Sequence, residues 1–209
     1  MTTIYLVRHG QNDFIGKSHR LAGWLPDVHL NDCGRAQAHA LAEYFSKIHI
    51  RAIYSSPLER TIETAEPIAE AKGLPIEKRD NLGEIKYGRW EGQSLKTLSR
   101  RKLWPVIQHT PSLARFPEGE SFVEAQNRVV FEIEHLRSIH KSPKAAILCV
   151  SHADVIKLII AHYLGLPLDL FQRIVVMPAS ISILQIEHVP RLVVMNDMQA
   201  TNKSGSAIE

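Results

Sequence analysis

The segment Ile4-Tyr5-Leu6-Val7-Arg8-His9-Gly10 lies close to the start of the 209-residue chain. Its first four residues are apolar apart from one tyrosine hydroxyl, and they predict a short buried strand. An arginine, a histidine and a glycine follow at the point where such a strand ends. In an open α/β sheet, ligands bind outside the carboxyl ends of the strands. This segment therefore indicates both the class of fold and the place to look for a site.

Apolar runs alternate with amphipathic helical stretches along the rest of the chain. Such alternation is typical of helices that cover both faces of a mostly parallel sheet. We therefore predict an α/β fold, a three-layer α/β/α sandwich. Residues 1–200 are expected to form one domain with a cap or active-site loop insertion at about 73–120, and residues 201–209 a loose tail. The predicted strands cover residues 4–7, 52–55, 145–150, 180–187 and 192–195.

The predicted helices carry recognisable start signals. Ser56 is typical of an N-cap, Pro57 of the first helical position, and Glu59 completes a capping box. Pro67 lies inside this helix and predicts a kink or an early end. Ser121 begins a second capping box. Helices are expected over residues 32–48, from 56 onward, near 94–104, and over 121–140 and 154–164.

Composition and charge are those of an ordinary globular protein. Apolar residues make up 44% of the chain and charged residues 22%. No apolar run is long enough to span a bilayer, and no export signal is recognisable, so we expect no membrane partner and a cytoplasmic location. The net charge of +3 comes from scattered residues, which predicts no nucleic-acid partner. Cys33 and Cys149 are too few for a disulfide framework or a zinc site.

Arginine and histidine side chains gather at the predicted strand ends. Arg8 and His9 follow the first strand. Arg60 lies in the first turn after the second strand, and His152 follows the strand over 145–150. Two guanidinium groups match the oxygens of a phosphate, and neutral imidazole is a nucleophile near neutral pH. The pattern predicts a phosphoryl-transfer site that uses no metal and no other cofactor.

Such a site also needs a proton donor for the departing oxygen. A carboxylic acid with a raised pKa is the usual donor. Glu84 is our candidate, and Glu91 in the neighbouring motif is the alternative. A metal hydrolase with His9, His152 and Glu84 as ligands is the main chemical competitor. Two arginines aimed at the same place would repel a cation, which favours the phosphate interpretation.

Five motifs occur in one order along the chain. Leu6-Val7-Arg8-His9-Gly10 is similar to the RHG signature of the histidine phosphatase superfamily, which includes cofactor-dependent phosphoglycerate mutase. RHG alone is short, but the whole series resembles this family, and the resemblance extends from residue 4 to about 165. The other matching motifs are residues 30–38, 55–61, 82–92 and 150–153.

The resemblance implies a phosphoglycerate mutase-like fold and a role for each site residue. By resemblance, His9 is the nucleophile that becomes phosphorylated, His152 assists it, and Glu84 is the general acid. Asn12 stands where the family often has Ser or Thr, so an altered phosphate contact is expected, and Ile15 replaces a common Asn. The residues implied to hold phosphate oxygens are Arg8, Arg60, His152 and Asn12.

The implied activity is hydrolysis of a phosphomonoester, a small anionic phosphorylated metabolite, through a phosphohistidine. A cofactor-dependent phosphoglycerate mutase is the alternative, because the same core residues serve both reactions. The stretch 90–95 is more similar to the phosphatase branch. Basic residues of the cap between 86 and 102 suggest a second acidic group on the substrate. The sequence leaves the oligomeric state open, a homodimer included.

Overall fold

The computed structural model describes residues 2–141 and 145–201, so the tail predicted at 201–209 lies outside the described residues beyond Thr201. Its centre is a six-stranded sheet in the order β3-β2-β4-β1-β5-β6. The pairs β3-β2, β2-β4 and β4-β1 are parallel, whereas β5 is antiparallel to β1 and β6 to β5. The strands are β1 (Thr2–Arg8), β2 (Ala52–Ser55), β3 (Ile76–Lys78), β4 (Ala145–Ser151), β5 (Ile181–Ile186) and β6 (Arg191–Asp197).

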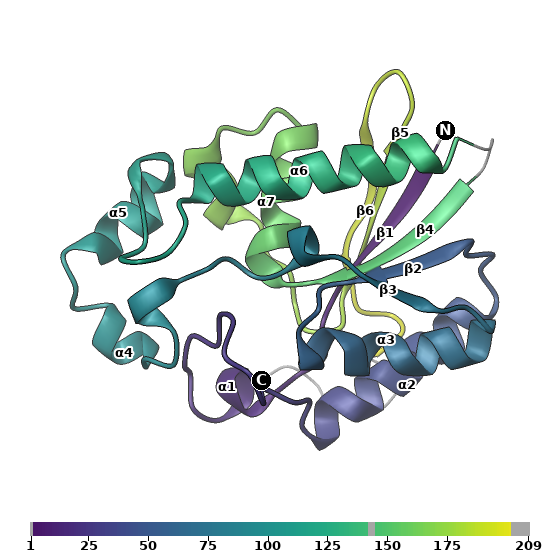
Figure 1. The fold of residues 1–209 in the computed structure, drawn as a ribbon, viewed down its shortest axis with the longest axis horizontal. Helices are drawn as coiled ribbons and strands as arrows, with labels where there is room; N and C mark the ends of the chain where they lie inside the picture. Colours follow the sequence, from purple (N-terminus) through teal and green to yellow (C-terminus); the bar gives the residue numbers. More distant parts are fainter. Residues whose placement is uncertain (1, 142–144, 202–209) are drawn as a thin grey trace.

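Helices cover both faces of this sheet, with α6 and α7 on one side and α2 and α3 on the other (Figure 1). Alternate residues of β1 belong to different cores, because successive side chains of a strand point to opposite faces. Ile4 and Leu6 lie in the core on the α6 side, and Val7 lies in the core with α2 and α3. This arrangement confirms the predicted sandwich. The helices are α2 (Asp32–Ser46), α3 (Glu59–Lys72), α6 (Phe122–Ile139) and α7 (Ala153–Tyr163).

The start of α3 differs from the prediction. The helix begins at Glu59 with Leu58 as its N-cap, and no side chain caps it. Ser56 is not the N-cap because its hydroxyl is bonded to Nε2 of His152 at 2.8 Å. The expected early end at Pro67 is also wrong, since the helix continues to Lys72. The second predicted capping box, at Ser121, is confirmed.

The segment 73–120 contains more structure than the sequence indicated. It begins with β3, an edge strand that the sequence analysis missed because three residues are too short to show a period. The single helix expected near 94–104 is two helices, α4 (Leu95–Leu98) and α5 (Leu103–His109). Both lie beyond the sheet at the end where the site residues gather (Figure 1). Within the described residues, no helix has the length and apolar character needed to cross a bilayer.

Candidate active site

The loops that follow β1, β2 and β4 are joined by backbone hydrogen bonds at the carboxyl edge of the sheet. The amide of His9 donates to the carbonyl of Ser151 at 3.0 Å, and the amide of Ser56 donates to the carbonyl of Val150 at 3.0 Å. The N-terminus of α2 packs closely on the first of these loops. A Cβ at Gly34 would lie 2.0 Å from the Gln11 carbonyl oxygen, so only glycine fits there. The strand ends therefore hold their side chains in a fixed relation.

The imidazole of His9 is buried, and its proton position follows from one hydrogen bond. Nδ1 lies 2.7 Å from the carbonyl oxygen of Gly10. A carbonyl can only accept, so Nδ1 carries the proton and Nε2 keeps its lone pair. Burial, and then the positive charges of Arg60 and Arg8, lower the pKa of His9 well below its ordinary value. The ring is therefore neutral, with Nε2 available as a nucleophile.

Two guanidinium groups lie beside this ring with unused donors. Arg60 is 1% exposed and donates through Nη2 to the Gly23 carbonyl at 2.8 Å. Arg8 donates through Nη1 to the Val176 carbonyl at 2.7 Å. Among the described residues, Nε and Nη1 of Arg60 and Nε of Arg8 are buried without a partner. Such donors are costly to bury unless a ligand accepts from them, and a phosphate would do so.

His152 is hydrogen-bonded to one of these two arginines, Arg60. Its Nδ1 accepts from Nη2 of Arg60 at 3.2 Å, so Nε2 carries the proton and donates to the Ser56 hydroxyl at 2.8 Å. The ring is fully buried, and its centroid is 5.3 Å from that of His9. Both ring nitrogens thus have partners, and His152 is absent from the lining of the cavity described below. In this arrangement the ring orients Arg60.

Glu84 brings a carboxyl group to the same place. Its Oε1 accepts from the backbone amide of Ile85 at 2.9 Å, and Oε2 lies 3.8 Å from Nδ1 of His152. Burial, followed by the charge of Asp154, raises the pKa of Glu84 to about 7. Glu91, the alternative acid, does not line the cavity and accepts from the amide of Tyr87. Glu84, and not Glu91, therefore shares the cavity with His9 and lies close to His152.

Asn12 is buried, and within the described part of the chain only the oxygen of its side-chain amide has a hydrogen-bond partner. Its Oδ1 accepts from the amide of Ile15 at 3.1 Å and so caps α1 (Asp13–Gly16). Its Nδ2 is buried with no partner among the described residues. That N–H pair is available to an oxygen in the cavity. Ile15 also lines the cavity and offers only an apolar surface there.

A cavity of about 160 Å³ joins these residues. Three of its lining residues were not anticipated from the sequence: Tyr87, Asp154 and Arg20. The Tyr87 hydroxyl donates to Asp154 at 3.1 Å, and Lys157 pairs with the other carboxylate oxygen at 3.0 Å. Asp154 stands two residues after His152 in the first turn of α7, and this position was the available signal. The site residues predicted from the sequence that line the cavity are Arg8, His9, Asn12, Arg60 and Glu84.

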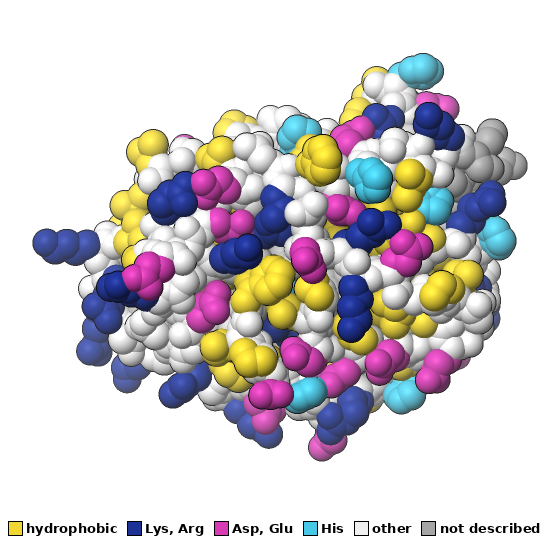
Figure 2. All heavy atoms as spheres, viewed as in Figure 1, with side chains coloured by type: hydrophobic (Ala, Val, Ile, Leu, Met, Phe, Trp, Pro, Cys, Tyr) yellow, Lys and Arg dark blue, Asp and Glu magenta, His cyan; other side chains and the backbone are white. Residues whose placement is uncertain are grey.

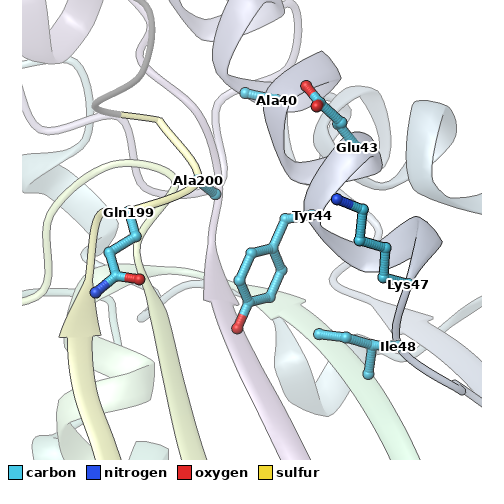
Figure 3. A pocket seen from close by; sticks show the side chains of 7 residues that line it. All are labelled: Ala40, Glu43, Tyr44, Lys47, Ile48, Gln199 and Ala200. Carbon is cyan, nitrogen blue, oxygen red and sulfur yellow. The ribbon is translucent and has the colours of Figure 1, made fainter.

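A groove also lies elsewhere on the molecule, away from the strand ends. A shallow groove of about 320 Å³ runs between α2 and residues 199–200, where Tyr44 faces Gln199 (Figure 3). It shares no residue with the cavity at the strand ends and has neither arginine nor histidine in its lining. Across residues 2–141 and 145–201, no three His, Cys, Asp or Glu side chains are grouped as a metal site requires. The cavity at the strand ends is therefore the candidate site.

Comparisons with known proteins agree with this architecture. A model of the histidine phosphatase superfamily (branch 1) matches residues 4–198. Phosphoserine phosphatase 1 of Hydrogenobacter thermophilus is 33% identical over 192 residues, which cover 90% of this chain and 88% of that protein. A probable phosphoglycerate mutase, GpmB, of Photorhabdus laumondii is 31% identical over 195 residues, which cover 92% and 88%.

A solved structure shows the same fold. The mycobacterial glucosyl-3-phosphoglycerate phosphatase superposes with a TM-score of 0.84 at 27% identity, over 93% of this chain and 98% of that one. The fold is therefore shared, over most of the chain, with a phosphatase of known structure. Because the family match extends over nearly the whole chain, this protein belongs to the histidine phosphatase superfamily, branch 1.

Proposed function

We propose that this protein is a phosphomonoester hydrolase that acts on a small phosphorylated metabolite through a phosphohistidine at His9. The enzyme class rests on the family and on relatives that include phosphoserine and glucosyl-3-phosphoglycerate phosphatases. The observation that carries the mechanism is the neutral imidazole of His9, whose lone pair on Nε2 lies beside unpaired arginine N–H groups.

The first step forms a bond between Nε2 of His9 and phosphorus while the bond from phosphorus to the leaving oxygen breaks. Arg8, Arg60 and Asn12 supply unpaired N–H donors for the other phosphate oxygens. Glu84 gives its proton to the leaving oxygen, because a carboxyl with a pKa of about 7 holds a proton near neutral pH.

The second step returns the enzyme to its starting state. Glu84, now ionised, takes a proton from water, and the water oxygen attacks phosphorus. The bond between phosphorus and Nε2 breaks, and inorganic phosphate leaves. A direct contact of His152 with phosphate requires its Nδ1 to part from Arg60, so we assign His152 first to the positioning of Arg60. In this proposal, residues 73–120 act as the cap of a single domain. The proposed location is the cytoplasm, as expected from the sequence.

The test is a phosphomonoester panel with wild type and the His9→Ala variant. We expect the variant to lose at least about 10³-fold in rate, the scale for removal of a covalent nucleophile. Wild type should also form an acid-labile phosphoenzyme in rapid-quench experiments, and His9→Ala should not. Activity should persist in excess chelator, since no step uses a metal. A variant that still turns over normally would disprove the role of His9, and loss of activity in chelator would favour the metal hydrolase.

A mutase is the second candidate, because relatives include proteins named probable phosphoglycerate mutase GpmB. Transfer between hydroxyls would use the same residues of the cavity. The two reactions differ in whether water or a second hydroxyl accepts the phosphoryl group. Interconversion of 2- and 3-phosphoglycerate with a bisphosphate primer, without release of phosphate, would favour the mutase over the hydrolase.

A further inference from the structure

A second cavity adjoins the phosphate cavity under the cap. It has a volume of about 190 Å³. Leu21, Tyr87 and Asp154 line both cavities, so the two share a wall. A phosphoester whose phosphorus lies at His9 therefore has this second cavity beside it, within reach of its alcohol part. The lining of the second cavity then indicates what kind of alcohol fits.

Five of the eleven described residues that line the second cavity are aromatic. Trp90 stacks with Trp104 at 6.3 Å between ring centroids, and Phe116 meets Trp90 edge-on at 5.5 Å. Phe116 also contacts Phe122 at 5.4 Å and Tyr87 at 4.9 Å. Rings held by several others in this way give rigid walls that favour another ring or a large apolar group. They come from residues 87–116 of the cap and from the start of α6.

Charge in the second cavity is unfavourable for an acidic group. Asp154 is the one charged residue among the described residues that line it, and the other polar side chains are those of Gln108, Gln172 and Tyr87, with the indole N–H groups of the two tryptophans. Lys157 already pairs with Asp154. No lysine or arginine of the described residues lines this cavity. A carboxylate placed here would face Asp154, and Lys157 beside it is already bonded to Asp154 and to Gln172.

The basic residues of the cap lie elsewhere. Lys96, Arg100, Arg101 and Lys102 are exposed, and Figure 2 shows Lys and Arg side chains on the outer face around α4 and α5. Arg89 pairs with Glu118 at the surface. None of them lines either cavity. Their charges can attract a phosphorylated molecule from a distance, but they do not select its alcohol part.

We propose that the second cavity binds the alcohol part of the substrate, and that this alcohol carries an aromatic ring or a comparably large apolar group and no acidic group. The proposal rests on the proposed function only in that the phosphate lies at His9. It selects among phosphomonoesters, against small acidic ones such as phosphoserine. Arg20 is exposed and donates to the Gly92 carbonyl; apart from the phosphate-binding Arg8 and Arg60, it is the one cation among the described residues that line the phosphate cavity.

The test compares alkyl esters with similar leaving groups: ethyl phosphate, 2-(1-naphthyl)ethyl phosphate and O-phospho-L-serine. We expect kcat/KM for the naphthyl ester to exceed that of the other two by about 10- to 100-fold. Trp104→Ala should reduce the ratio of naphthyl to ethyl ester at least about tenfold, because it removes one wall. Gln108→Arg should shift the preference toward phosphoserine by a similar factor. Arg100→Ala, on the outer face, should keep all three ratios.

Equilibrium binding separates the subsite from turnover. The matching phosphonates, which are not hydrolysed, should bind wild type at least about tenfold more tightly with the naphthyl group than with ethyl. If the naphthyl phosphonate binds so but no ester is hydrolysed, the subsite stands and the proposed function fails. Equal affinity of the two phosphonates, or a wild-type preference for phosphoserine, would overturn the aromatic subsite even if phosphate is released. A ratio unchanged by Trp104→Ala would overturn it as well.

Discussion

The Glu84→Gln variant isolates proton donation from the rest of the site. The pKa of Glu84 rises from 4.5 to about 7 because the group is buried and faces Asp154. Glutamine has nearly the same shape, and its carbonyl oxygen can still accept from the Ile85 amide. It cannot supply the proton that the leaving oxygen needs. Any change in rate therefore reports on that proton.

The rate effect should depend on the leaving group and on pH. For an alkyl ester we expect kcat/KM to fall by about 10²- to 10⁴-fold, the usual contribution of a general acid. p-Nitrophenyl phosphate should lose less than about tenfold, because its phenolate leaves without a proton. The ratio of wild type to variant for the alkyl ester should decline as pH rises above about 7, since wild type then loses its acid form. Ionisation of the substrate cancels in this ratio.

The substitution that lowers the rate should increase the free energy of unfolding at alkaline pH. Between pH 4.5 and about 7 the folded wild type keeps a proton that the unfolded chain has lost, so its stability falls as pH rises through this window. The pKa change corresponds to about 3 kcal/mol in the free energy of unfolding. Glutamine never ionises, so Glu84→Gln should be more stable than wild type at pH 8, with the advantage shrinking toward pH 4. Urea unfolding at both pH values measures this difference.

Glu91→Gln is the matched control. Its carboxyl accepts from the Tyr87 amide outside the cavity, so we expect the rate on alkyl esters to stay within about threefold of wild type. Glu84 is not the general acid if Glu84→Gln affects p-nitrophenyl and alkyl esters equally. The same conclusion follows if Glu91→Gln, rather than Glu84→Gln, abolishes the fall in kcat/KM for alkyl esters above about pH 7.

Two further substitutions test the surroundings of the reacting groups. Asp154→Asn removes the charge that helps to raise the pKa of Glu84 but keeps an acceptor for Tyr87. The alkaline limb of the pH profile of kcat/KM should therefore move to lower pH. A limb that does not move would mean that burial alone raises the pKa of Glu84. Arg60→Lys loses the fork that contacts the Gly23 carbonyl and His152, and kcat/KM should fall by about 10²-fold or more, whereas Arg100→Lys on the cap serves as control; equal rates for the two would contradict a phosphate role for Arg60.

The sequence predicted the sandwich and the convergence of Arg8, His9 and Arg60, because a parallel sheet brings its strand ends together whatever the details of packing. It did not predict the use of Ser56. A capping signal at a helix start is local, whereas the hydroxyl is bonded to His152, which follows the neighbouring strand β4 and is distant in the sequence. The short edge strand β3 carries too few residues for a period, and its pairing with β2 is a tertiary contact.

The surroundings of Glu84 could not be predicted from the sequence either, because they too depend on tertiary contacts. Asp154 is an ordinary residue in the first turn of a helix until the fold brings it to Tyr87 and Glu84, residues about 70 positions earlier in the chain. The raised pKa depends on that distance and on burial, and neither is visible in a motif. Similarly, Arg20 and Tyr87 belong to loops whose course the sequence leaves open.

The carbonyl of Glu84 is held from outside the cap. Arg128 of α6 donates to the carbonyls of Asn81, Gly83 and Glu84 at 2.8, 3.0 and 3.2 Å, and Trp24 donates to the last of them at 2.5 Å. Neither donor belongs to α4 or α5. Substitutions in α4 or α5 therefore leave the contacts that hold this carbonyl in place. The second cavity is lined by several segments, so a change in the proposed substrate preference requires substitutions in more than one of them, while the position of the proton donor is set separately.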